Sequence, residues 1–239
     1  MSALGHYLEE EGVATVAIAL IRPQAENTRP PRALWVPFEL GRPIGPPSDA
    51  AFQKRVILTA LRMLTASGGP VLIDDFPDDD PREAADPDWR PPIGPAAASR
   101  DQGALAEAIE AELRVLAPPY AASCSKRVRS TVGLSTLASA ACGEYLAAWL
   151  RGDRPASPVA DMSPALALRF VIDDLKAFAL EAAIASGKPS SKQLGEWLWN
   201  DTALGVGLQV LRRDCLAGDD ERLKAVAAFF VPALRVPAG

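Results

Sequence analysis

The sequence predicts an α/β N-terminal unit, with a short parallel sheet of incomplete Rossmann type, followed by an all-α C-terminal domain. Continuous apolar runs rich in β-branched residues stand in the first third of the chain, whereas helical spacing dominates after residue 100. Between them, residues 74–99 are rich in proline and aspartate. We therefore expect domains at residues 1–75 and 100–239, joined by an acidic linker at residues 76–99.

The first predicted elements are a helix and two strands. Residues 4–11 have helical spacing, and Gly12 follows them at a position where helices favour glycine. Residues 13–21 form a continuous apolar run, which is typical of a strand buried on both faces of a parallel sheet. A second strand is expected at residues 33–36.

A proline-rich loop and a long helix come next. Residues 37–47 contain four prolines and two glycines, which exclude regular structure. Ser48 or Asp49 is the expected N-cap of a helix that continues to residue 65. The apolar residues of this helix keep helical spacing: Phe52, Val56, Ile57, Leu61 and Leu64. A third strand at residues 71–73 completes the unit.

Residues 76–99 are predicted to be a solvated connector. From residue 74 to residue 99 the chain carries eight acidic residues against two arginines, together with six prolines, which disfavours a core. The acidic residues lack the spacing of a calcium-binding EF-hand loop. Trp89 is the residue expected to anchor the connector to a surface.

Six helical patterns follow the connector. Pro118 and Pro119 are expected to end the first of these helices, and Ser135, Ser163 and Ser190 are expected N-caps. The predicted helices cover residues 102–116, 136–150, 164–185, 191–200, 201–217 and 219–231. Together they predict an all-α domain.

Charge and composition exclude several functions. The 239-residue chain has a net charge of −5, which argues against binding to nucleic acid or to an anionic membrane. Its longest apolar run is far shorter than a membrane-spanning helix. Neither nucleic acid nor a membrane is therefore an expected partner.

Histidine and cysteine usage argues against metal and cofactor chemistry. His6 is the single histidine, so a multi-histidine zinc site is excluded. Three cysteines, Cys124, Cys142 and Cys215, are too widely spaced for a CxxC motif. Their odd number and the acidic, non-signal-like N-terminus favour reduced thiols in the cytoplasm. We expect no metal and predict no cofactor.

The long predicted helix at residues 164–185 carries charges within an apolar sequence. Asp174 and Glu181 are seven residues apart and so share a face, while Asp173 and Lys176 are three apart and can pair. Solvated surface charge is the ordinary interpretation. Partial burial is the alternative, and it requires pairing or a function.

Two tryptophans stand close together near residue 200. Trp197 and Trp199 are two residues apart, so they point in different directions on a helix. We expect one of them in the core and the other, Trp199, to face a pocket or a partner.

Topology predicts a ligand site at the strand ends. In open parallel sheets ligands bind beyond the carboxyl ends of the strands, which here means Arg22, the loop at residues 37–43, and residues 74–75. Glu39 and Arg42 are the chemical groups of that loop. Arg42 is expected either to hold a ligand carboxylate or to form a salt bridge with Glu39.

Three segments carry a resemblance to a known family. Through GVATV at residues 12–16, PPRALWVPFELGRPIGPP at 30–47 and FQKRV at 52–56, the chain resembles the selenoprotein B subunits of glycine, sarcosine, betaine and D-proline reductases. The resemblance covers about residues 4–75 and implies an α/β scaffold with a proline-rich loop. Members of that family cleave carbon–nitrogen bonds reductively with a selenocysteine or cysteine that precedes the first helix. We expect that segment to be missing, so no catalytic residue carries over.

Two functions are therefore considered. The first is an enzyme or enzyme subunit that binds a small acidic or amine-bearing metabolite between its two domains. The second is a non-catalytic scaffold that homodimerises or docks on a catalytic protein, because a missing strand leaves a sheet edge unpaired. Both predict a homo- or hetero-oligomer. The candidate ligand-binding residues are Arg22, Glu39, Arg42, Asp174, Lys176 and Trp199.

Overall fold

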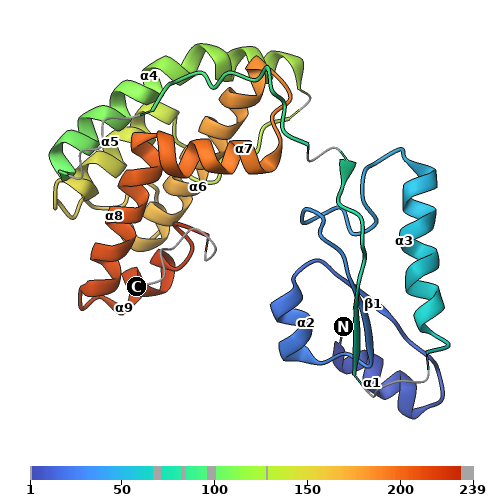
Figure 1. Ribbon diagram of the computed structural model, residues 1–239. Helices are drawn as coiled ribbons and strands as arrows, with labels where there is room; N and C mark the ends of the chain where they lie inside the picture. Colours follow the sequence, from blue (N-terminus) through green and yellow to red (C-terminus); the bar gives the residue numbers. More distant parts are fainter. Residues whose placement is uncertain (1, 67–70, 82–83, 96–100, 128, 233–239) are drawn as a thin grey trace. The chain divides into compact units, whose positions relative to one another are not determined.

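A computed structural model describes residues 2–66, 71–81, 84–95, 101–127 and 129–232 (Figure 1). The chain folds as two compact units, Met1–Ala84 and Ala85–Gly239. The first holds a short parallel sheet with helices, and in the described residues the second is built from helices. Each unit is considered by itself below.

The sheet of the first unit has three parallel strands, β1 (Ala17–Ala19), β2 (Arg32–Trp35) and β3 (Leu72–Asp75), in the order β1-β2-β3. The expectation of a long, fully buried strand at residues 13–21 was wrong. Only three residues of that run form strand, and all three are half-buried. The reason is position, since β1 lies at the edge and pairs with β2 alone in the described part of the chain.

In the described residues of this unit, three helices flank the sheet: α1 (Ser2–Glu10), α2 (Arg22–Thr28) and α3 (Ala50–Met63). The expected helix after Asp49 is confirmed, and the Asp49 carboxylate caps it by accepting the Phe52 N–H at 2.9 Å. The sequence analysis missed α2. It has seven residues and one buried side chain, Ala25, so it offers no amphipathic pattern to detect.

Three phenylalanines form the centre of the first core. Phe38, Phe52 and Phe76 pack edge to face or tilted with ring centroids 5.5–5.8 Å apart. Leu34 of β2 and Val56 of α3 lie in the same cluster, both fully buried. Phe76 belongs to the stretch expected as solvated connector, so the first unit extends past residue 75.

The helical unit contains α4 (Gln102–Lys126), α5 (Ser139–Leu150), α6 (Pro164–Ala183), a 3₁₀ turn (Ile184–Ser186), α7 (Ser191–Glu196), a π-helical turn (Trp197–Asp201), α8 (Ala203–Ala217) and α9 (Glu221–Ala227). Helix α4 packs against α5, α6 and α8. The expected caps Ser163 and Ser190 are confirmed, because each side chain accepts a backbone N–H of the first helical turn. The predicted positions of these helices were thus close to the observed ones.

Helix α4 is longer than expected because Pro118 and Pro119 do not end it. Proline removes a backbone donor and leaves a carbonyl one turn earlier without its helical partner. The buried residues of α4 near this point are Leu113 and Leu116, whereas Pro118 is exposed. The exposed side of this turn leaves the freed carbonyl groups accessible to solvent.

The second half of the expected connector belongs to the helical unit. Trp89 is 8% exposed, donates its indole N–H to the Ala183 carbonyl at 3.2 Å and packs edge-on against Trp197. The backbone of Asp86 exchanges two hydrogen bonds with the Gln193 side chain. The expectation of a solvated connector over residues 76–99 therefore differs from the structure at Phe76 and from Asp86 to Trp89, while residues 82–83 and 96–99 lie outside the described part of the chain.

Candidate functional site

Asp174 of α6 is buried and fully engaged by the chain that connects α4 to α5. Its carboxylate accepts the backbone N–H groups of Gly133, Leu134 and Ser135 at 2.8–2.9 Å, and the Ser135 hydroxyl at 2.6 Å. Ser135 was expected to cap α5, but α5 begins only at Ser139. The hydroxyl of Ser135 serves Asp174 instead.

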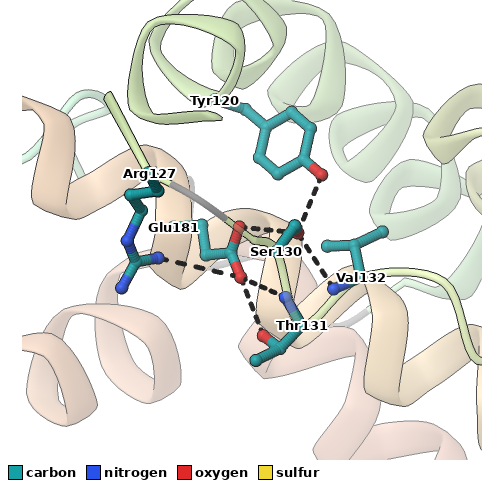
Figure 2. A network of polar contacts seen from close by, with 6 residues as sticks. All are labelled: Tyr120, Arg127, Ser130, Thr131, Val132 and Glu181. Carbon is teal, nitrogen blue, oxygen red and sulfur yellow. Dashed lines mark hydrogen bonds and ion pairs between the residues drawn. The ribbon is translucent and has the colours of Figure 1, made fainter. Parts of the chain in front are cut away.

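Glu181 lies two turns further along α6 and holds the same segment (Figure 2). It accepts the Thr131 N–H at 2.7 Å and the hydroxyls of Thr131 and Ser130 at 2.8 Å. Arg127 approaches it at 3.8 Å, and the Tyr120 hydroxyl reaches Ser130 at 3.1 Å. The network thus runs from the end of α4 to the middle of the connection.

The hydrogen bonds decide the charge state of both carboxylates. Burial by itself raises the pKa of Asp174, but the donors from Ser135, Gly133 and Leu134 outweigh it and lower that pKa below its ordinary value. Burial by itself also raises the pKa of Glu181. The hydrogen bonds from Thr131 and Ser130 outweigh this effect, so the pKa of Glu181 is lowered as well. Both groups are therefore anionic at neutral pH.

These contacts revise the expected role of Asp174. The prediction that Asp174 and Glu181 share a face is confirmed, as is the alternative that the charges are buried, since the two residues are 1% and 5% exposed. However, the described donors around Asp174 already occupy its two oxygens. We interpret it as a residue that shapes residues 130–135.

Lys176 is also engaged within its own unit. Its ammonium lies 2.8 Å from Asp173, which confirms the expected pairing, and donates to the Phe229 carbonyl at 3.2 Å. Asp173 additionally pairs with Arg169 at 2.5 Å. Lys176 therefore ties α6 to the chain that follows α9.

Trp199 does not face a pocket. Trp197 and Trp199 are 2% and 6% exposed, and both belong to the core of the helical unit. The expectation that only one of them is buried assumed a regular helix. The π-helical turn from Trp197 to Asp201 changes the direction of successive side chains, and α8 packs on it through Gly205.

At the carboxyl edge of the sheet, the structure brings Arg22 and Asp75 together. Arg22 follows β1 and forms ion pairs with Asp75, at the end of β3, and with Glu26 at 2.9 Å. Its guanidinium also lies over the Trp35 ring, 5.6 Å from the centroid. The hydrogen bond that Arg22 donates to the Asp75 carboxylate raises the pKa of Arg22, whose side chain is 39% exposed.

The proline-rich loop brings Glu39 and Arg42 together through their backbones in a turn. The Arg42 N–H donates to the Glu39 carbonyl at 3.0 Å in a turn, and the Arg42 guanidinium lies 3.9 Å from Asp80. Asp80 has a fully buried side chain, whereas Glu39 is exposed. Arg42 thus has a carboxylate neighbour from the chain segment after β3.

The sequence analysis missed an exposed apolar face on α3, called here the α3 outer face. It consists of Ile57, Leu58 and Leu61, which are 42%, 39% and 49% exposed. The helical spacing of Ile57 and Leu61 in the sequence did not show on which face of the helix they lie. The buried face of α3 consists instead of Phe52, Val56, Ala60 and Met63.

Few other features of the described residues offer a site. No group of three or more His, Cys, Asp or Glu residues is arranged there to hold a metal ion, and none of the described helices is long and apolar enough to cross a membrane. A hollow of about 250 Å³ lies between α4 and α5, lined by Leu113, Arg114 and Glu144 among others. It is partly open to solvent.

The chain was compared with protein-family models, curated proteins and solved structures, and none of these comparisons found a match. The resemblance to reductase B subunits therefore stays a prediction.

Proposed function

We propose that this protein is a non-catalytic subunit that docks on a protein partner through its α/β unit. The α3 outer face carries this proposal. Helix α3 has one complete buried face, and Ile57, Leu58 and Leu61 add a second apolar face on the opposite side. A helix that is apolar on opposite sides is typically covered on both.

The spacing of these three residues makes the face continuous. Leu61 is one turn from both Ile57 and Leu58, so the three side chains adjoin on the helix surface. Full burial of one fully exposed side chain of this kind contributes roughly 1.5–3 kcal/mol, and these three are 39–49% exposed, so covering the patch is worth about 2–4 kcal/mol. Single exposed apolar residues need no explanation, but a cluster on one face favours an interaction site.

The state of the candidate ligand residues supports the same proposal. Asp174 and Trp199 are buried in the helical unit, and Lys176 is bound to Asp173 and Phe229. These three residues stabilise their own unit, which leaves the metabolite-binding hypothesis without its helical half. Docking requires none of them.

Site-specific photo-crosslinking in the host cell tests the proposal. Leu58 is replaced by benzoylphenylalanine, and the matched control carries the same group at Val115, a 54% exposed position on α4. We expect a protein adduct of defined mass from position 58 and none from position 115. No adduct from position 58, or the same adducts from both positions, would contradict docking.

One observation favours a second function, binding of a small amine-bearing metabolite at the strand ends. Arg22 and Trp35 form a half-exposed platform there, and Asp75 and Glu26 give it an excess of negative charge. The Trp35 indole N–H is buried without a hydrogen-bond partner among the described residues. Calorimetric titration of the full chain with sarcosine tests this function: binding that Asp75→Asn abolishes supports it, and absence of heat contradicts it.

A further inference from the structure

Helix α1 presents a second exposed apolar face, called here the α1 outer face. It consists of Leu4, Tyr7 and Leu8, which are 52%, 68% and 37% exposed. These residues are three and four positions apart, so they adjoin on one side of the helix. The α/β unit therefore carries two apolar helix faces, one on α1 and one on α3.

The opposite side of α1 is fixed to the unit. Glu9 accepts the Thr15 N–H at 2.7 Å and pairs with Arg32, and the His6 ring bonds to the Arg29 carbonyl at 2.7 Å. A Cβ atom at Gly5 would lie 3.1 Å from the Pro31 ring, so the helix packs closely there. The α1 outer face is consequently held away from the unit's own core.

The two outer faces carry opposite charge. At the end of α1, Glu10 and Glu11 are exposed, and Ser2–Glu10 contains no lysine or arginine. On α3, Lys54 and Arg62 are exposed beside the apolar residues, and Ala50–Met63 contains no acidic residue. One face is acidic and apolar, and the other is basic and apolar.

We propose that the partner of the α3 outer face is the α1 outer face of a second copy of this chain. Contact between two α3 faces would bring Lys54 and Arg62 of both copies together, and contact between two α1 faces would do the same for glutamates. Only the mixed contact joins apolar residues while pairing opposite charges. A two-fold pair of copies makes this contact twice and leaves neither face open.

This inference rests on the proposed function, because it names the partner that the docking face receives. The two can fail separately. A protein adduct from position 58 that contains a different chain leaves docking intact and overturns self-pairing. No adduct from position 58 overturns both.

Mixing of charge-reversed copies tests the pairing without disturbing either core. One variant carries Glu10→Lys and Glu11→Lys, and the other carries Lys54→Glu and Arg62→Glu. Each variant alone places like charges at the contact, so its dimer dissociation constant is expected to rise roughly tenfold or more. In an equal mixture both contacts regain opposite charges, and dimers of one copy of each variant are expected.

Light scattering on the full chains measures these masses, and circular dichroism checks that each variant is folded. Tyr7→Asp and Leu61→Asp form a second pair, in which each variant alone is monomeric and the mixture recovers one contact. Val115→Asp is the matched control and stays dimeric. A monomeric wild type, a dimeric Tyr7→Asp variant, or a mixture that fails to recover dimers would overturn the proposal.

Discussion

Two buried carboxylates on α6 organise the irregular chain between α4 and α5. Asp174 and Glu181 together accept four backbone N–H groups and three hydroxyls from residues 130–135. A segment without regular structure must place its backbone donors somewhere, and here anions on a neighbouring helix receive them. These residues are therefore structural anchors of the helical unit.

Asp174→Asn is expected to destabilise the protein by about 2–4 kcal/mol. The amide keeps a single acceptor oxygen and turns an NH₂ group toward N–H donors, which leaves buried groups unsatisfied. Urea unfolding monitored by circular dichroism measures the loss. The matched control, Asp173→Asn, weakens two part-exposed ion pairs, with Arg169 and with Lys176, and should cost about 1 kcal/mol. Equal effects from both variants would contradict the assignment.

Stability is expected to fall on the acid side because of these same groups. Hydrogen bonds lower the pKa of Asp174 and of Glu181 in the folded state, so their contribution is complete above the unfolded carboxyl pKa. It is lost as the pH falls below about 5 toward the lower native values. Unfolding free energies measured between pH 7 and pH 3 check this dependence.

Glu181→Gln should make that acid dependence shallower. Glu112→Gln is the control: burial raises the pKa of Glu112, so its contribution has the opposite sign and is lost as the pH rises. If the unfolding free energy of Glu181→Gln falls as steeply with decreasing pH as that of the wild type, the lowered pKa of Glu181 is contradicted.

For individual residues, the spacing in the sequence predicted that Asp174 and Glu181 share a helix face. It predicted neither their burial nor their hydrogen-bond partners. The heptad spacing is a local property of one helix. The donors come from backbone groups some 40–50 positions earlier, in a segment whose sequence has no period to read. Burial of a charge therefore required knowledge of that segment's path.

The packing of α8 on the π-helical turn depends on one glycine. A Cβ atom at Gly205 would lie 1.9 Å from the Leu198 carbonyl oxygen and 2.9 Å from the Trp199 Cα, both backbone atoms. Gly205→Ala is therefore expected to destabilise the protein by roughly 3 kcal/mol. Thermal unfolding measures this, and Gly103→Ala, where the nearest atom is a capping side chain, should change stability by less than about 1 kcal/mol.

Substitutions on the buried face of α3 should affect stability much more than substitutions on its outer face. Val56→Ala removes a fully buried side chain and is expected to cost about 2 kcal/mol. Leu61→Lys alters the α3 outer face and should change the unfolding free energy by less than about 0.5 kcal/mol, when measured at concentrations that keep copies apart. A large loss in Leu61→Lys would mean that the outer face belongs to the unit's own core.

Elements with capping residues were predictable, and short or irregular ones were not. Asp49, Ser163 and Ser190 each satisfy an exposed helix donor, a local interaction that sequence reports directly. Helix α2 lacks a side-chain cap and an apolar stripe, so nothing in its sequence distinguished it from a loop. The prediction that Pro118 and Pro119 end α4 was wrong, because the surroundings of a proline, rather than its residue type, decide whether a helix continues.

For the whole molecule, the division into an α/β and a helical part was readable from composition, whereas the connector was not. Phe76 and Trp89 stand among prolines and aspartates, yet each enters the core of a different unit. Composition averages over a window, so Phe76 was missed, and Trp89 was expected to anchor the connector to a surface rather than to enter a core. The contacts of the helical candidates Asp174, Lys176 and Trp199 were not predicted for a related reason, since polarity along a sequence does not show which groups neighbouring segments already bind.

Docking through the α3 outer face is tested most directly by the native mass of the purified wild type beside that of Leu61→Asp. We expect the wild type to carry a second copy, with a mass near twice the 25.3 kDa of the chain. We expect Leu61→Asp to be folded and monomeric. A wild type that has the mass of one chain, or a Leu61→Asp variant that keeps its partner, would contradict docking between copies through the α3 outer face.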